Sequence, residues 1–146
     1  VCSSDLEIRP SAGIWPMDPL DRSRARSVCA EMHSGFRALR NSMPMNIRGR
    51  HPGKGMNDAV AKDIGRISAI WAAASGPFLF GEFCAADAFY APVASRFVTY
   101  GVELAGAARN YQERLLDADG VREWCDGART EPEFVAADEP YAEPPG

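Results

Sequence analysis

The chain has 146 residues, of which 46% are hydrophobic, and its formal net charge is −4. This length and composition suit a single domain with one core. An acidic chain lacks the basic face that nucleic acid or an anionic membrane would require, so we expect neither as a partner.

Targeting signals and disulfides are not indicated. No apolar run approaches the roughly 20 residues of a spanning helix, and no basic region followed by an apolar one opens the chain. The four cysteines, Cys2, Cys29, Cys84 and Cys125, are widely separated. This spacing is typical of free thiols in a reducing compartment. We therefore expect a cytoplasmic protein.

The first 18 residues predict no regular structure. Residues 1–6, VCSSDL, fit nothing that follows and match the translation of a sequencing adapter, so we expect them to be foreign. Residues 7–18 contain Pro10, Gly13 and Pro16 without any hydrophobic period. They predict an extended connector.

A helix start follows at Asp18, which is an N-cap residue with Pro19 at the first helical position. Apolar residues then recur at offsets of three and four and predict one continuous helix. They are Ala25, Val28, Cys29, Met32, Phe36, Leu39 and Met43. On one flank of this stripe lie Arg22, Arg26, His33 and Arg40.

Residues 47–55 form a basic loop that we interpret as a solvated turn. Asn57 then caps a second helix. Its inward face is Val60, Ile64, Ile67, Trp71 and Ala74, and its outward face is Lys62, Asp63 and Arg66.

The central helix begins near Ala85. Cys84 occupies the cap position, and the carboxylate of Asp87 can accept from free backbone N–H groups at the helix start. Pro92 should bend the helix, and Gly101 ends it. Its apolar face is predicted to be Ala86, Phe89, Val93, Phe97, Tyr100 and Leu104.

Two further helical segments follow, and no strand pattern is found. The first carries Leu104, Ala108, Tyr111 and Leu115, and the second carries Val121, Trp124, Cys125 and Ala128. Residues 131–146 form an acidic, Pro-rich tail in which Phe134, Val135 and Tyr141 could dock. The sequence therefore predicts an all-α helical bundle over residues 19–130.

Two stretches resemble the C-terminal helical domain of glutathione transferases. Residues 77–83, PFLFGEF, with Ala86-Asp87 and residues 91–93, APV, are similar to its central helix, although Cys84 stands where the family usually has a hydroxyl. Residues 27–40, SVCAEMHSGFRALR, with residues 43–46, MPMN, resemble its first helix in a bacterial subset. Residues 14–16, IWP, match the linker that follows the family's thioredoxin-like domain.

This resemblance implies a bundle of the glutathione transferase C-terminal type and a fragment of a homodimeric enzyme that conjugates glutathione to small electrophiles. Glutathione and the catalytic residue would belong mainly to the missing thioredoxin-like domain, so the fragment alone should be inactive. The helical domain would supply the apolar wall for the co-substrate. The resemblance makes His33, Phe36, Arg40, Tyr90 and Tyr100 its candidates, against the alternative that they are ordinary core and surface residues.

A metal site, a second function class and an exposed surface are considered next. Cys29 and His33 lie one helical turn apart and could present two metal ligands, but no second pair is evident and we predict no metal site. The chain could instead be a non-enzymatic, glutathione-transferase-like interaction module. A domain cut at its linker should also expose a partly apolar shelf. Its members would be Trp15, Met17, Met43 and Met45, with the side of the first helix that bears His33, Phe36 and Arg40.

Overall fold

The computed structural model describes residues 13–136 and 139–141. The expected foreign residues 1–6, residues 7–12 of the connector, and residues 137–138 and 142–146 of the tail lie outside this range. The described chain is all-helical, and its only extended pairing is an isolated bridge between Phe78 and Gly81. The predicted all-α bundle is confirmed. The helices are α2 (Pro19–Ser34), α3 (Arg37–Ser42), α4 (Asp58–Ala72), α5 (Ala85–Tyr100), α6 (Gly106–Asp117) and α7 (Asp119–Thr130).

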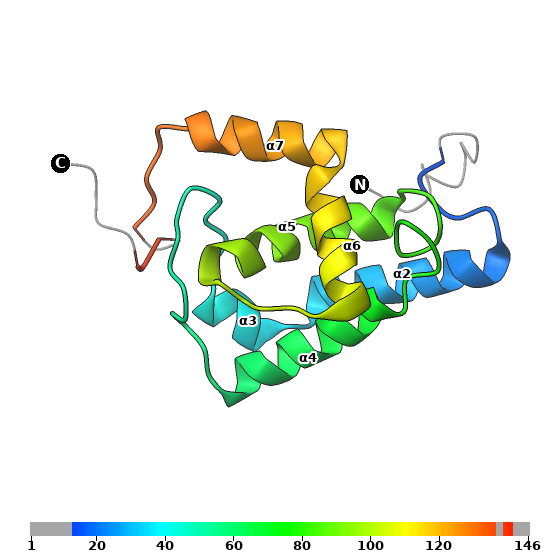
Figure 1. Ribbon diagram of the computed structural model, residues 1–146, viewed down its shortest axis with the longest axis horizontal. Helices are drawn as coiled ribbons and strands as arrows, with labels where there is room; N and C mark the ends of the chain where they lie inside the picture. Colours follow the sequence, from blue (N-terminus) through cyan, green and yellow to red (C-terminus); the bar gives the residue numbers. More distant parts are fainter. Residues whose placement is uncertain (1–12, 137–138, 142–146) are drawn as a thin grey trace.

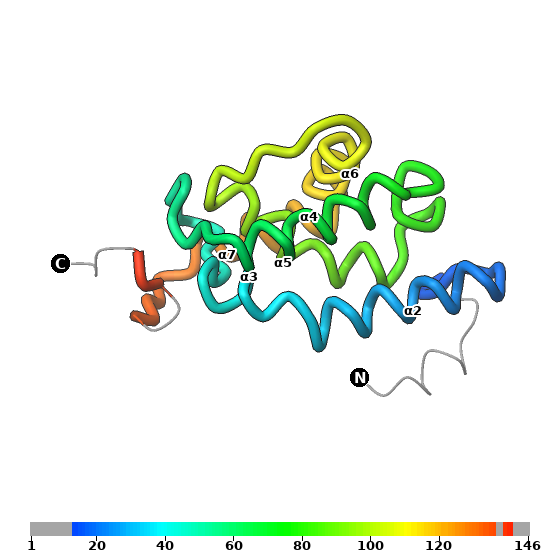
Figure 2. The backbone as a smooth tube through the Cα atoms, turned by 90° about the horizontal axis from the view of Figure 1, so that it is seen from below, coloured from blue at the N-terminus to red at the C-terminus, as the bar shows by residue number. Residues whose placement is uncertain are grey.

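Helix α5 forms the centre of the bundle (Figure 1). It packs against α2 and α6, while α4 packs against α3 and α6, and α7 is attached through α6. Figure 2 shows α2 along one side of the molecule and α6 on the opposite side. None of the helices in the described part of the chain is both long and apolar enough to cross a membrane.

The core is dominated by aromatic side chains from three helices. Trp71 of α4 is fully buried. Its ring centroid lies 5.2 Å from that of Phe97, 5.3 Å from that of Tyr111 and 6.1 Å from that of Tyr90. Tilted and edge-on ring pairs at such distances are favourable. The inward face predicted for α4 therefore meets α5 and α6 at Trp71.

The buried stripe of α5 differs from the prediction at two positions, of which Leu104 lies beyond the end of the helix. Val93 and Phe97 are buried as expected, but Phe89 is 43% exposed and Tyr90 is 0% exposed. Positions 86, 90, 93, 97 and 100 alternate steps of four and three and line one face of a helix. Phe89 lies about 100° away around the helix axis. Either Phe89 or Tyr90 fits the helical spacing of the apolar residues, and in the structure Tyr90 is the one that faces the core.

Helix α5 starts at Ala85, as predicted, and its cap carboxylate is fully buried. Asp87 Oδ2 accepts from the backbone N–H of Cys84 at 2.9 Å. Its Oδ1 accepts from the backbone N–H of Leu79 at 3.0 Å and from the hydroxyl of Tyr111 at 2.9 Å. Asp87 thus fastens the α4–α5 connection and α6 to the start of α5. The helix runs on through Pro92 and ends at Gly101, whose φ of 65° is left-handed.

The predicted first helix is wrong as a single element, because it breaks between α2 and α3. Gly35 ends α2, and a Cβ there would lie 2.5 Å from the carbonyl oxygen of Glu31. Phe36 then adopts the left-handed conformation with φ 53° and ψ 40°. The apolar spacing continues across this joint, so the pattern alone could not locate it.

The joint is held by two polar side chains. Asp63 of α4, predicted to face outward, accepts from the backbone N–H of Leu39 at 3.0 Å and so caps the start of α3. Arg40 donates to the carbonyls of His33 and Gly35 at 3.1 and 2.8 Å, which satisfies the end of α2. Asp63 is therefore a tertiary cap.

The basic loop of residues 47–55 is not a free turn. The backbone N–H of His51 donates to the carbonyl of Thr99 at 2.7 Å, and that of Gly53 donates to the carbonyl of Tyr100 at 2.9 Å. Both carbonyls belong to the last turn of α5, where the backbone carbonyls have no N–H donor within the helix. The loop therefore covers the C-terminal end of the central helix.

Candidate binding cleft

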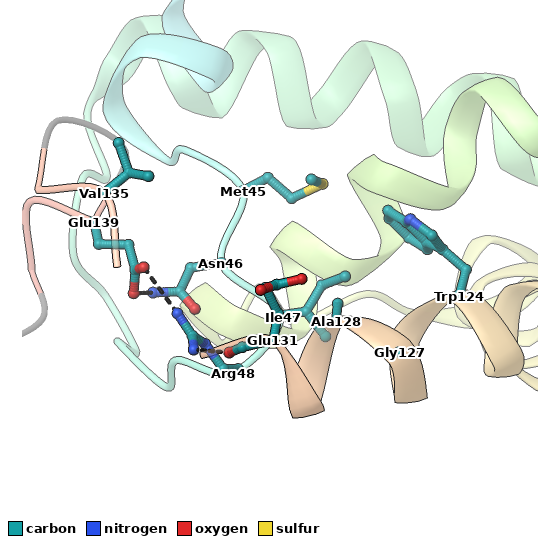
Figure 3. Close-up of a pocket in the computed structure, with 10 residues that line it drawn as sticks. All are labelled: Met45, Asn46, Ile47, Arg48, Trp124, Gly127, Ala128, Glu131, Val135 and Glu139. Carbon is teal, nitrogen blue, oxygen red and sulfur yellow. Dashed lines mark hydrogen bonds and ion pairs between the residues drawn. The ribbon is translucent and has the colours of Figure 1, made fainter. Parts of the chain in front are cut away.

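An open cleft of about 490 Å³ lies between the loop after α3, the C-terminal half of α7 and the tail (Figure 3). This volume is within the range of small-molecule sites. The walls are mainly apolar, and the polar groups gather at the tail end. The lining residues are Met45, Asn46, Ile47, Arg48, Trp124, Gly127, Ala128, Glu131, Val135 and Glu139.

Helix α7 contributes one of its faces to the cleft. Trp124, Gly127 and Ala128 follow one another at helical spacing and so share one side of α7, and Glu131, the residue after the helix end, continues this wall. Trp124 is 38% exposed. One turn later stand Gly127, which has no side chain, and Ala128, which has only a methyl group. The indole face is consequently open toward the cleft. The buried side of α7 carries Val121 and Cys125 instead.

The loop wall is held in place by side chains of α5. Thr99 Oγ1 donates to the carbonyl of Asn46 at 2.5 Å, and Tyr100 donates through its hydroxyl to the carbonyl of Pro44 at 2.9 Å. Arg96 Nε donates to the carbonyl of Met43 at 3.1 Å. With its carbonyls bound from the core side, the loop presents Met45 and Ile47 to the cleft. This wall is therefore preformed.

The tail is fastened over the other end of the cleft. Arg48 donates to the backbone carbonyl of Glu131, to that of Glu133 at 2.6 Å and to the Glu139 carboxylate at 3.0 Å. Asn46 Nδ2 donates to the second oxygen of Glu139 at 2.8 Å. These bonds are drawn in Figure 3 for the residues that line the cleft. The tail is thus a structural border of the cleft.

A second, apolar groove of about 290 Å³ adjoins the cleft at Trp124. It lies between α5 and α7, and its lining residues are Phe83, Ala88, Ala91, Pro92, Gly120, Val121 and Trp124. The connector reaches this end of the molecule, because the backbone N–H of Ala85 donates to the carbonyl of Ile14 at 2.8 Å. Phe83 is 40% exposed there. The groove therefore lies beside the point where the connector meets the bundle.

The five co-substrate candidates from the sequence lie elsewhere, and none lines the cleft or the groove. His33 is exposed on α2, and Arg40 binds the end of that helix. Phe36 is 7% exposed, and Tyr90 and Tyr100 are buried. Burial raises the pKa of both tyrosines, that of Tyr100 to about 12. The structure thus gives these three aromatic residues core positions within this chain.

The expected shelf is formed only in part, and its member Trp15 is half-buried. Met17 and Met45 are 71% and 40% exposed, but Met43 is 0% exposed and packs in the core with Phe36. Cys29 is buried, while His33 is exposed on the same helix. No group of three or more potential metal ligands comes together among the described residues.

Sequence reasoning missed Trp124, Arg48 and the tail carboxylates as site residues. The spacing of 124, 128 and 131 is readable in the sequence, but Trp124 is grouped there with Val121, Cys125 and Ala128 in one helical segment. The sequence matches no model of a known protein family, and a comparison with curated proteins finds no match either. The case for a function therefore rests on the geometry of the cleft.

Proposed function

We propose that this chain is the helical domain of a glutathione-transferase-type protein and that the cleft carries the apolar part of an electrophilic co-substrate. The observation that carries the proposal is the cleft itself, with Trp124, Met45 and Ile47 around a space of about 490 Å³. Aromatic and aliphatic walls with a few polar groups at one end are typical of small-molecule sites. The two sequence stretches described above support the choice of family.

The proposal assigns glutathione activation to another part of the parent protein. Cys29, Cys84 and Cys125 are buried, and burial raises the pKa of each thiol, in two cases to about 12 and about 11. A thiol with a raised pKa is protonated at neutral pH and is a poor nucleophile. None of these three cysteines is suited to catalysis.

The groove beside the connector is proposed as the docking surface of a thioredoxin-like domain that carries glutathione. Phe83 and Trp124 are partly exposed there, and the connector enters next to them. Apolar grooves of this kind mark interaction sites. A domain attached through residues 13–18 would be held close to the groove, which raises its effective concentration.

Binding to the isolated chain tests the cleft. A dinitrobenzene that lacks a leaving group should shift the indole N–H signal of Trp124 in nitrogen–proton correlation spectra. We expect Trp124→Ala to abolish the saturable shifts of Met45 and Gly127, and Trp15→Phe, a change outside the cleft, to leave them. Shifts confined to residues away from α7 would place the ligand elsewhere.

Activity tests the enzyme part of the proposal. The isolated chain should not conjugate glutathione to a chlorodinitrobenzene above the uncatalysed rate, whereas the parent protein should. Conjugation by the isolated chain would contradict the assignment of the reaction to another domain. The alternative is a non-enzymatic interaction module, which the exposed apolar residues of the Phe83 groove favour. It would be supported if the parent protein showed no conjugation and bound a protein partner through that groove.

A further inference from the structure

The charged groups of the cleft distinguish apolar ligands by the charge that these ligands carry. Among the described residues, three charged side chains line it, namely Arg48, Glu131 and Glu139. Arg48 and Glu139 form an ion pair with an N–O distance of 3.0 Å, and Asn46 binds the other oxygen of Glu139. Glu131 is joined to this network only through its backbone carbonyl.

The carboxylate of Glu131 therefore has no hydrogen-bond or ion-pair partner within the described part of the chain. In Figure 3 it lies beside Ile47 at the cleft end of α7. It follows Trp124 by seven residues, which places both on the same side of the helix. An indole face and a carboxylate on one wall are the two groups that an organic cation binds.

The end of α7 adds to the same preference. The helix ends at Thr130, immediately before Glu131, so the negative end of its dipole adjoins the cleft. Arg48 does not reverse this field, because its donors are directed at two tail carbonyls and at Glu139. Within the described lining, an anionic ligand would meet Glu131 and the helix end, and the one basic side chain, Arg48, is already engaged with the tail.

We propose that the cleft selects ligands that combine an apolar or aromatic body with a positive charge, such as an ammonium, amidinium or pyridinium group. The aromatic body lies against Trp124, Met45 and Ile47, and the cation is placed between Trp124 and Glu131. This inference rests on the proposed function and names the class of co-substrate that the cleft accepts.

Three probes that share a naphthylmethyl body test the charge preference: naphthylmethylammonium, naphthylmethanol and naphthylacetate. Dissociation constants are taken from the Trp124 and Gly127 shifts of the full chain. We expect the cation to bind on the order of fivefold more tightly than the alcohol, and the anion to bind most weakly. The difference should shrink as the salt concentration rises, because the charges are partly exposed.

Glu131→Gln supplies the decisive variant, since it removes the charge and keeps the shape. The preference for the cation over the alcohol should then fall to the smaller part that the indole face of Trp124 and the end of α7 supply. Glu133→Gln is the matched control, because its carbonyl also accepts from Arg48 but the residue does not line the cleft. The preference should persist in that variant.

The outcomes separate the two proposals. Equal binding of cation and alcohol by the unmodified chain, or tightest binding of the anion, overturns the charge preference and leaves the apolar cleft in place. A preference that Glu131→Gln leaves undiminished overturns the role of this residue. Absence of binding by all three probes contradicts the cleft itself and the proposed function with it.

Discussion

The hydroxyl of Tyr111 donates to Oδ1 of Asp87 at 2.9 Å, and both side chains are 0% exposed. This bond joins α6 to the first turn of α5. Burial and the neighbouring Asp87 carboxylate raise the pKa of Tyr111 well above its usual range, so the phenol stays a donor. The packing of α6 is thus tied to the same carboxylate that caps the central helix.

Tyr111→Phe should lower the free energy of unfolding by about 1–3 kcal/mol, because the buried carboxylate loses one of its three donors. Urea unfolding measures the change. The matched control is Tyr90→Phe, since Tyr90 is equally buried but its hydroxyl lies 3.4 Å from the carbonyl of Val28. A control loss as large as that of Tyr111→Phe would show that the Asp87 bond contributes little.

Asp87→Ala should be more damaging than an ordinary cap substitution, with a loss of about 3–5 kcal/mol. The substitution leaves the backbone N–H groups of Leu79 and Cys84 and the hydroxyl of Tyr111 without their acceptor. Comparison with Asp18→Ala, an exposed cap that accepts from Asp21 at 2.9 Å, isolates the effect of burial. That exposed cap should cost only about 1 kcal/mol, and similar losses for both variants would refute the special role of Asp87.

Arg48→Gln should release the tail without unfolding the bundle. The substitution removes donors to the carbonyls of Glu131 and Glu133 and to the Glu139 carboxylate. Amide hydrogen exchange of residues 131–136 should accelerate, while exchange in α5 stays unchanged. Arg50→Gln is the control, because within the described part of the chain Arg50 donates to carbonyls of its own loop, those of Ile47 and Gly49. Unchanged exchange in the tail would show that Arg48 does not hold it.

The buried thiols predict a loss of stability at high pH. Burial raises the pKa of Cys29 from 9.0 to about 12 and that of Cys84 from 9.0 to about 11. Because the folded chain keeps these protons above the pH at which the unfolded chain releases them, unfolding becomes easier as the pH rises. The contribution of the two protonated thiols to the free energy of unfolding is complete below pH 9 and is lost as the pH rises through about 11 and 12.

Urea unfolding between pH 8 and pH 11 measures this slope, and Cys29→Ala and Cys84→Ala should each reduce it. The same burial should keep both thiols unreactive toward a disulfide reagent in the native chain at neutral pH, measured after Cys2→Ser. Rapid labelling of Cys29 without unfolding would contradict the assigned burial.

The helix starts could be predicted from the sequence because caps are local. Asp18, Asn57 and Cys84 each precede a helix. The side chains of Asp18 and Asn57 accept from backbone N–H groups in the first turn, as expected of N-caps. The break at Gly35 could not be read in the same way, since the apolar spacing continues through it. The turn depends on Asp63, which is 24 residues away from the N–H that it caps.

The candidate site was less predictable than the fold. The period of α5 allowed either Phe89 or Tyr90 to face inward, and only the packing of Trp71 decides between them. The cleft needs the loop after α3 and the tail to meet, and that contact depends on bonds between residues distant in the sequence. No local pattern near Arg48 indicates that its partners are Glu131, Glu133 and Glu139.

The fastening of the tail has a consequence for the order of folding. Arg48 and Glu139 are 91 residues apart, and Tyr141 and Ser42, whose carbonyl accepts from the tyrosine hydroxyl at 2.9 Å, are 99 apart. Closing so long a loop costs conformational entropy. This cost is smaller once the intervening helices have packed together. During synthesis the bundle can assemble before residues 131–141 emerge, and the border of the cleft is completed only with them. A nascent chain would therefore fold before it acquires its full binding site.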